Sequence, residues 1–176
     1  MDNKHIKNLI LAKFKQINSF NSLDMTEENF WLMKSEPDAY SIDTLKKDDV
    51  TLWDGIRNYQ ARNFMRQMNK GDKVFFYHSN CKPPGIVGLM EVIDLNIVDP
   101  TQFDQDSKYF DPKSKPNNPR WDCVKVKYIS KSNKILSLPE LKILFNEDEL
   151  LVVKKGNRLS ILPVRNDIAK ILLEKI

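Results

Sequence analysis

Two large aromatic residues stand among arginines, amides and a carboxylate in Thr51-Leu52-Trp53-Asp54-Gly55-Ile56-Arg57-Asn58-Tyr59-Gln60-Ala61-Arg62-Asn63-Phe64. An aromatic residue in a core is normally framed by apolar neighbours, whereas Trp53 is followed by Asp-Gly and Tyr59 is preceded by Arg-Asn. Aromatic faces stack on nucleobases, amides hydrogen-bond to base edges, and guanidinium groups bind phosphate. The stretch therefore predicts recognition of a nucleotide base before it predicts any reaction.

Short strands and short helices flank this stretch on both sides. The mostly apolar segment 30–35 ends at Glu36-Pro37-Asp38, as expected of a strand that enters a turn. We predict further strands over 73–78, 86–93, 124–128 and 159–162, and a loop over 106–118. We predict helices over 41–45, from about residue 58, over 138–145 and over 164–175. This interleaving favours a compact α+β domain around a small, mixed, barrel-like sheet.

Residues 1–28 have a different pattern from the rest of the chain. Ile6, Leu9, Ile10, Phe14 and Ile17 recur at helical spacing with lysines between them, which predicts an amphipathic helix followed by a polar linker. We expect this N-terminal helix to dock on the domain or on a partner subunit. A basic face for nucleic acid is the alternative.

Charge and cysteine content exclude several classes of protein. The 28 basic and 24 acidic residues give a formal net charge of +4, which is compatible with nucleic acid but is also common elsewhere. The two cysteines and two histidines have no zinc-ligand spacing and form no disulfide framework, so we expect no metal. The sequence also has no cofactor loop, so we expect no cofactor. No apolar run is long enough to span a bilayer, and we expect a soluble protein, cytoplasmic or, in a eukaryote, nuclear.

Five segments resemble the EVE domain family: 30–37, 53–64, 75–81, Pro84-Gly85-Ile86-Val87-Gly88 and Asn118-Pro119-Arg120-Trp121. The resemblance extends from about residue 29 to the C-terminus and predicts an EVE domain over residues 29–176. It implies a PUA-like fold, a small mixed β-barrel with short flanking helices, and a pocket for a flipped or unpaired modified base. Family members are associated with modified cytosine in DNA, and related domains with modified RNA bases.

The base-binding pocket is predicted to contain Lys34, Ser35, Trp53, Asn58, Tyr77, His78, Ser79 and Trp121. We expect Trp53 to stack on the base, the alternative being a half-buried core residue. Asn58 offers a donor and an acceptor to a base edge. The resemblance places Lys34 and Ser35 where PUA-like relatives meet their ligand.

The strand over 73–78 leaves a choice between two neighbours. Tyr77 and His78 point to opposite faces of a regular strand, so only one of them faces the pocket. His78 is favoured as the polar reader, the alternative being a histidine fixed by a backbone hydrogen bond. Trp121 is either a second wall or lid of the pocket, or an anchor at the start of a strand. Trp31 is expected in the core.

Three arginines are candidates for binding phosphate. Arg62 and Arg66 lie one helical turn apart and repel each other unless an anion lies between them; a merely solvated helix face is the alternative. Arg57 either precedes the helix or is held by an acid such as Asp54.

The residues predict a non-enzymatic protein that binds a nucleotide base, and the resemblance implies that the base is modified, either a modified cytosine in DNA or an RNA base. The alternative is a small hydrolase of the ASCH type acting on modified nucleosides, with Lys34 and Glu36 as its reactive pair. Cys81 lacks a glycine elbow or a helix N-terminus that would activate it as a nucleophile. An adaptor that uses the N-terminal helix would leave the stretch 53–62 unexplained.

Overall fold

A mixed sheet of six strands forms the centre of the domain in this computed structural model, which describes residues 29–176. The helix and linker predicted for residues 1–28 lie outside the described residues. The strand order is β2-β5-β4-β3-β1-β6. The strands are β1 (Phe30–Ser35), β2 (Val50–Trp53), β3 (Lys73–His78), β4 (Gly85–Val98), β5 (Asp122–Ser137) and β6 (Ile161–Val164). β1 pairs parallel with β3 and antiparallel with β6, and the other neighbours are antiparallel.

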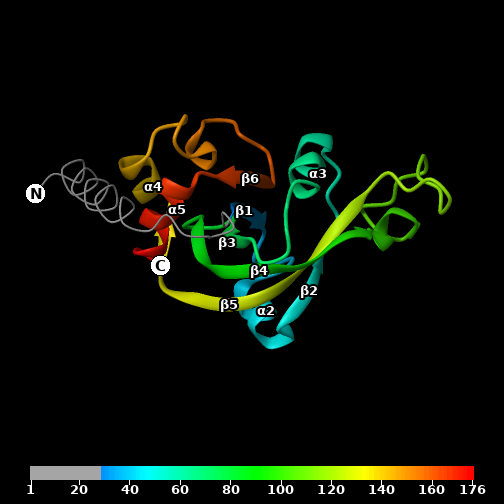
Figure 1. Cartoon of the computed structure of the whole chain (residues 1–176), viewed down its shortest axis with the longest axis horizontal. Helices are drawn as coiled ribbons and strands as arrows, with labels where there is room; N and C mark the ends of the chain where they lie inside the picture. Colours follow the sequence, from blue (N-terminus) through cyan, green and yellow to red (C-terminus); the bar gives the residue numbers. More distant parts are fainter. Residues whose placement is uncertain (1–28) are drawn as a thin grey trace, which may run out of the picture.

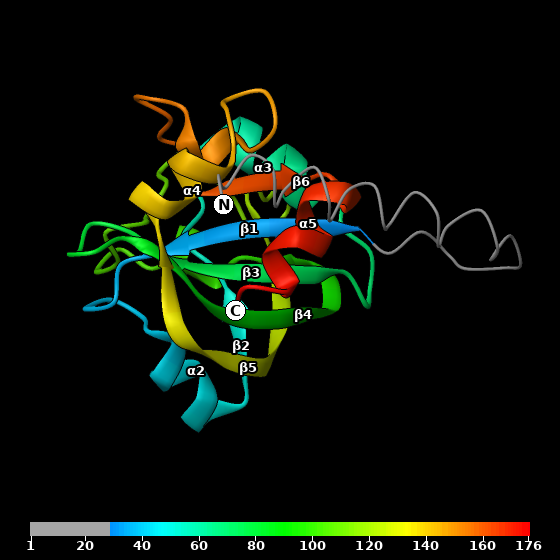
Figure 2. The same ribbon diagram turned by 90° about the vertical axis from the view of Figure 1, so that its left-hand side faces the viewer.

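The predicted α+β class and mixed sheet are confirmed. Figure 2 shows the strands following one another in a curved array, from β6 through β1, β3 and β4 to β5. The two edge strands, β2 and β6, are not paired with each other within residues 29–176, so closure into a barrel stays a prediction.

Four strands differ from the sequence prediction. β4 and β5 are longer than predicted, because register shifts let these strands bend and continue through polar residues. β6 begins two residues later than predicted and includes Pro163, which an edge strand tolerates because one side of it needs no backbone donor. β2 was not predicted, since its four residues lie in the stretch attributed to recognition.

Short, capped helices connect the strands. They are α2 (Ile42–Asp48), α3 (Tyr59–Met65), α4 (Leu138–Leu144) and α5 (Asn166–Leu173), with 3-10 turns η1 (Pro100–Gln102) and η2 (Leu151–Val153). The Ser41 side chain accepts a hydrogen bond from the Thr44 amide at 3.0 Å and caps α2, as its position predicted. α3 begins after Asn58 as predicted.

The sheet separates two hydrophobic cores, because the side chains of β1 alternate between its faces. Phe30 and Leu32 join a core completed by α4, α5 and η2, which we call the α4–α5 core. Trp31 and Met33 join a core completed by α2 and α3, which we call the α2–α3 core. Trp31 is 5% exposed and its indole Nε1 donates to Asp72 Oδ2 at 2.8 Å, so its predicted core position is confirmed.

A long connection, residues 99–121, joins β4 to β5 and projects to the far right in Figure 1. Gln102 holds its two ends together from a fully buried position. The Gln102 Nε2 donates to the carbonyls of Asp99 and Trp121, at 2.7 and 2.8 Å, and its Oε1 accepts from the Trp121 amide. The predicted loop over 106–118 lies within this connection, which brings an aromatic residue, Tyr109, to the site described next.

Candidate functional site

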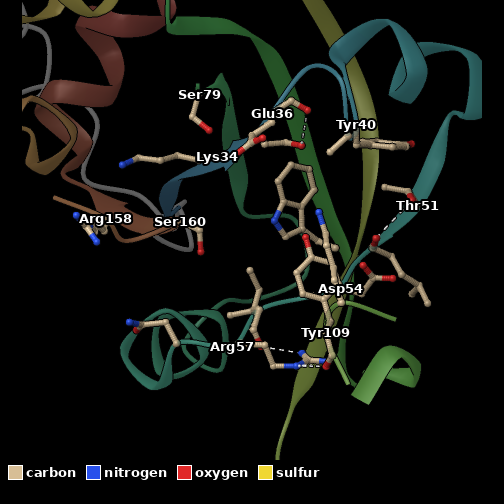
Figure 3. A pocket seen from close by; sticks show the side chains of 18 residues that line it. Lys34, Glu36, Tyr40, Thr51, Asp54, Arg57, Ser79, Tyr109, Arg158 and Ser160 are labelled. Carbon is tan, nitrogen blue, oxygen red and sulfur yellow. Dashed lines mark hydrogen bonds between the residues drawn. The ribbon is translucent and has the colours of Figure 1, made fainter. Parts of the chain in front are cut away.

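A cavity of about 670 Å³ opens where β1, β2 and the 99–121 connection meet. In the view of Figure 3, Lys34, Arg158 and Ser160 lie on one side of it, and Tyr40 and Thr51 on the other. The lining residues are Lys34, Ser35, Glu36, Ala39, Tyr40, Thr51, Leu52, Trp53, Asp54, Gly55, Ile56, Arg57, Asn58, Ser79, Lys108, Tyr109, Arg158 and Ser160. Its size falls within the range of small-molecule sites, roughly 300–1,000 Å³.

The structure brings six of the eleven predicted site residues to this cavity: Lys34, Ser35, Trp53, Arg57, Asn58 and Ser79. Tyr77, His78, Trp121, Arg62 and Arg66 are not among the residues that line it. The first group comes from strand ends and from the loop after β2. Residues of the second group pack in a core or bind other residues of the domain.

Trp53 is the last residue of β2 and combines both interpretations of its sequence context. It is only 7% exposed, and its ring meets Phe76 edge to face at 5.2 Å, within the α2–α3 core. It also lines the cavity, and its indole N–H makes no hydrogen bond to another residue of the range 29–176. The side chain is therefore a rigid wall with a free donor.

A glycine turn brings the 99–121 connection against this wall. Gly55 has φ +73°, and a Cβ there would lie 2.6 Å from the Tyr109 ring. Only glycine allows this approach without strain. The Gly55 amide donates to Asp99 Oδ2 at 2.9 Å, which fixes the turn to the root of the same connection.

Arg57 joins the two segments, and its acid partner is Asp99 rather than the predicted Asp54. Its Nη1 lies 2.7 Å from Asp99 Oδ2, and the Asp99 side chain is fully buried. Four of its five N–H groups donate, to Asp99, Thr101 Oγ1 and the carbonyls of Ile56 and Tyr109. Asp54 forms no ion pair with Arg57, because Asp99 lies fully buried beneath the loop and already faces the guanidinium. Little donor capacity remains for the phosphate predicted at Arg57.

Asn58 lines the cavity, but only one of the two polar groups of its side chain is left for a ligand. Its side-chain oxygen accepts from the amides of Gln60 and Ala61, at 2.9 and 3.1 Å, and so caps α3. The amide nitrogen is left as a donor.

The charges around the cavity are unevenly compensated. Burial lowers the pKa of Lys34, whose Nζ donates to the Asn157 carbonyl at 3.4 Å. Burial, and then the nearby Asp99 charge, raises the pKa of Asp54. Within residues 29–176, Lys34, Lys108 and Arg158 form no ion pair with a carboxylate. Lys34 and Glu36, the two residues of the hydrolase alternative, both line the cavity but form no ion pair with each other.

Tyr77 and His78 lie away from the cavity. Tyr77 is 3% exposed in the α4–α5 core, on the other face of the sheet. The His78 Nε2 accepts from the Ile42 amide at 3.1 Å, which is the backbone-fixed alternative for this histidine. Burial lowers the pKa of His78, consistent with a neutral ring that accepts a hydrogen bond.

Trp121 and the arginines of α3 belong to a neighbouring surface. Trp121 is 4% exposed at the start of β5 and donates from Nε1 to Asp111 Oδ2 at 2.7 Å, as an anchor would. Arg66 pairs with Asp122, so its charge is already compensated. Arg62 Nη1 donates to the Arg120 carbonyl at 2.7 Å.

Several lining residues were missed in the sequence. Tyr109 stands in a polar loop beside Lys108, the same kind of context that singled out Trp53, so that criterion would have found it. Asp54 was noticed only as a partner for Arg57. Arg158 and Ser160 reach the cavity because the segment before β6 lies beside β1, where the Lys34 amide donates to the Ser160 carbonyl at 2.8 Å. No local pattern encodes that pairing.

This sheet, with its cavity at the end of β1, is the fold of a known class of domains. The chain matches the EVE domain over residues 29–175 and belongs to the EVE domain family. It is homologous to thymocyte nuclear protein 1, with 42% identity to the rat protein over 74% of this chain and 63% of that one. Identity to the human protein is 46% over 64% and 55% of the two chains. The chain thus spans less than two thirds of these relatives' length.

The domain is also similar to solved structures of other proteins. A protein from Pseudomonas syringae is 42% identical, with a TM-score of 0.79 over 84% of this chain and 99% of that one. The human THYN1 protein in complex with DNA containing 5-methylcytosine is 38% identical, with a TM-score of 0.78 over 84% and 96%. In the part of the chain that the structure describes, no helix is long and apolar enough to cross a membrane.

Proposed function

We propose that this domain binds nucleic acid and holds one modified base, a modified cytosine in DNA, in the cavity lined by Trp53. The observation that carries the proposal is an aromatic wall in a cavity that also holds Lys34, Lys108 and Arg158, cations without carboxylate partners among residues 29–176. The human relative in complex with DNA containing 5-methylcytosine supports the choice of base and of nucleic acid. Such a protein acts in the compartment that contains its DNA, which is the nucleus if the cell is eukaryotic and the cytoplasm if it is not.

The lining suits a methylated cytosine in three respects. The Trp53 ring offers a face for stacking, which contributes about 1–3 kcal/mol per base. Leu52 and Ile56 provide apolar contact for a methyl group beside it. The Asn58 amide donates and the Asp54 carboxylate accepts, as the acceptors and the exocyclic amine on the pairing edge of cytosine require. The exposed Lys108 and Arg158 are available to the phosphate backbone.

The test replaces the aromatic face while keeping apolar volume. Because Trp53 is buried against Phe76, Trp53→Ala would also open a cavity in the core, and Trp53→Leu is the better variant. We expect Trp53→Leu to weaken binding to an oligonucleotide with 5-methylcytosine by about 1–3 kcal/mol. Fluorescence anisotropy over single- and double-stranded DNA and RNA, with methylated and unmethylated cytosine and adenine, measures this loss and the preferred ligand.

Trp31→Leu is the matched control, since Trp31 is equally buried in the same core but does not line the cavity. It should lower stability and leave affinity unchanged at a temperature where the variant is folded. If Trp53→Leu binds as tightly as the wild type, the stacking role is wrong.

A second candidate function rests on Lys34. Burial lowers the pKa of its ammonium, and no carboxylate of the described range 29–176 pairs with it. Both properties suit a general base in a nucleoside hydrolase. We expect the reader to leave the base unchanged, so prolonged incubation with methylated oligonucleotides or free nucleosides should produce no mass change. A mass change that disappears in Lys34→Ala would replace the reader with the hydrolase.

A further inference from the structure

A row of aromatic rings and guanidinium groups leads from the cavity to the surface beside it. Tyr109 lines the cavity, and the Arg57 guanidinium carbon lies 5.7 Å from the centre of its ring. The same carbon lies 5.4 Å from the Trp121 ring. Trp121 in turn stacks on Tyr59, with centroids 4.9 Å apart and planes 27° apart. The row therefore ends at Tyr59, the residue next to Asn58 of the cavity lining.

Tyr59 is an exposed ring held in place. It is 47% exposed, although it is a large hydrophobic residue. Trp121 supports it by stacking, and its hydroxyl accepts a hydrogen bond from Arg120 Nη2. Arg120 is itself fixed by an ion pair with Asp111 at 3.0 Å. An exposed aromatic ring with fixed orientation is what proteins offer to a stacked, unpaired base.

Arg62 adds an uncompensated positive charge to this ring. Its guanidinium carbon lies 4.8 Å from the centre of the Tyr59 ring. Each of its neighbours Arg57, Arg66 and Arg120 pairs with an aspartate, whereas Arg62 has no carboxylate partner within residues 29–176. Its Nη1 donates to the Arg120 carbonyl and its Nη2 to Asn63 Oδ1, which leaves one N–H of each Nη unused, while its Nε is buried. A guanidinium group with spare donors beside an aromatic ring matches a phosphate next to a stacked base.

We propose that Tyr59 and Arg62 form a second nucleotide subsite: Tyr59 stacks on the base that flanks the one in the cavity, and Arg62 binds the phosphate between them. The subsite rests on the proposed function, since it requires a strand with one base in the cavity. Stacking tolerates any base, so the subsite adds affinity without adding sequence preference. It also favours DNA whose flanking base is already unpaired.

The test combines a protein variant with a change in the ligand. The ligands are a single-stranded DNA with one 5-methylcytosine, the same strand with abasic positions on both sides of that base, and the unmethylated strand. We expect Tyr59→Ala to bind the intact strand roughly 10-fold more weakly than the wild type does, about 1.4 kcal/mol. The abasic flanks should weaken the wild type by a similar factor and leave Tyr59→Ala unaffected.

The outcomes separate the subsite from the cavity. If Tyr59→Ala weakens binding to the intact and abasic strands equally, it acts through the fold and the subsite is wrong, although methyl preference persists. If the wild type does not prefer the methylated strand at all, the proposed function fails instead. Tyr59→Phe should restore most of the affinity because it keeps the ring.

The phosphate contact has its own measurement. Arg62→Gln should reduce the dependence of log K on log salt by roughly 0.7 for a single strand, the contribution of one phosphate contact. Arg66→Gln, one turn along α3, should change the slope less because Asp122 already compensates Arg66. An equal or larger effect at Arg66 would assign the phosphate to Arg66 and overturn the role of Arg62.

Discussion

The two faces of the sheet differ in the side chains that pack against them and in whether they reach the cavity. The α4–α5 core is closed and largely aliphatic on its helical side, where Ile168, Ala169, Ile171 and Leu172 of α5 are at most 1% exposed. The α2–α3 core is rich in tryptophan and methionine and opens into the cavity through Trp53. Aliphatic packing of this density resists any change of shape, whereas methionine and aromatic surfaces adapt to ligands. One face therefore stabilises the domain, and the other carries the cavity of the proposed function.

The largest effect that tests this division is expected from Ile168→Ala in the α4–α5 core. Ile168 is 1% exposed, so the substitution leaves a cavity and should lower the free energy of unfolding by about 4 kcal/mol. Urea denaturation measures the loss, and affinity for methylated DNA should not change while the variant is folded. A variant that loses affinity without losing stability would break the comparison.

A smaller effect is expected at Asp99, which contributes both to the stability of the domain and to the shape of the cavity. Asp99→Asn removes the charge that faces Arg57 and weakens the bonds to Gly55 and Thr101, which should cost about 3 kcal/mol of stability. Because these bonds fix the cavity loop to the 99–121 connection, affinity should fall as well. The control is Asp122→Asn at the more exposed Arg66 pair, which should cost less than about 1 kcal/mol. Equal losses of stability in the two variants would contradict the role of the buried Arg57–Asp99 ion pair.

The smallest effect concerns the cap of α4, on the stabilising face. Hydrogen bonds from the Ser137 hydroxyl and amide, and then from Lys134, lower the pKa of Glu140 from its ordinary 4.5 to about 2. A carboxyl with a lowered pKa stabilises the fold above its ordinary value, and this contribution is lost as pH falls from about 4.5 towards 2. Ser137→Ala should cost about 1 kcal/mol at neutral pH and flatten this slope, as thermal unfolding between pH 2 and 6 would show. An unchanged slope would assign the acid sensitivity to other carboxyls.

Local patterns were sufficient for those parts of the fold and site that depend on neighbours in the chain. The Ser41 cap, the strand at 30–35 and the helix start after Asn58 were predicted because each is encoded within a few residues. The same holds for Trp53, Arg57 and Asn58, which line the cavity from the end of β2 and the loop that follows it.

Features that depend on distant residues were not predicted. Strand alternation separates Tyr77 from His78 but does not show which face holds the cavity, and the partner of His78 is the amide of Ile42, 36 positions away. The partner of Arg57 is 42 positions along the chain, at Asp99. The sequence offered Asp54 only because it was close.

The position of β1 between β3 and β6 has a consequence for the order of events during synthesis. β1 is among the first described residues to be made, yet its partner β6 begins at Ile161, and Ser160 and Arg158 of the cavity immediately precede it. Pairing over so long a separation in sequence is slow, because a large loop must close first. A nascent or truncated chain that ends before residue 158 lacks one side of the cavity and leaves an edge of β1 open. Under the proposed function, ligand binding is therefore acquired only once β6 has been made and paired with β1.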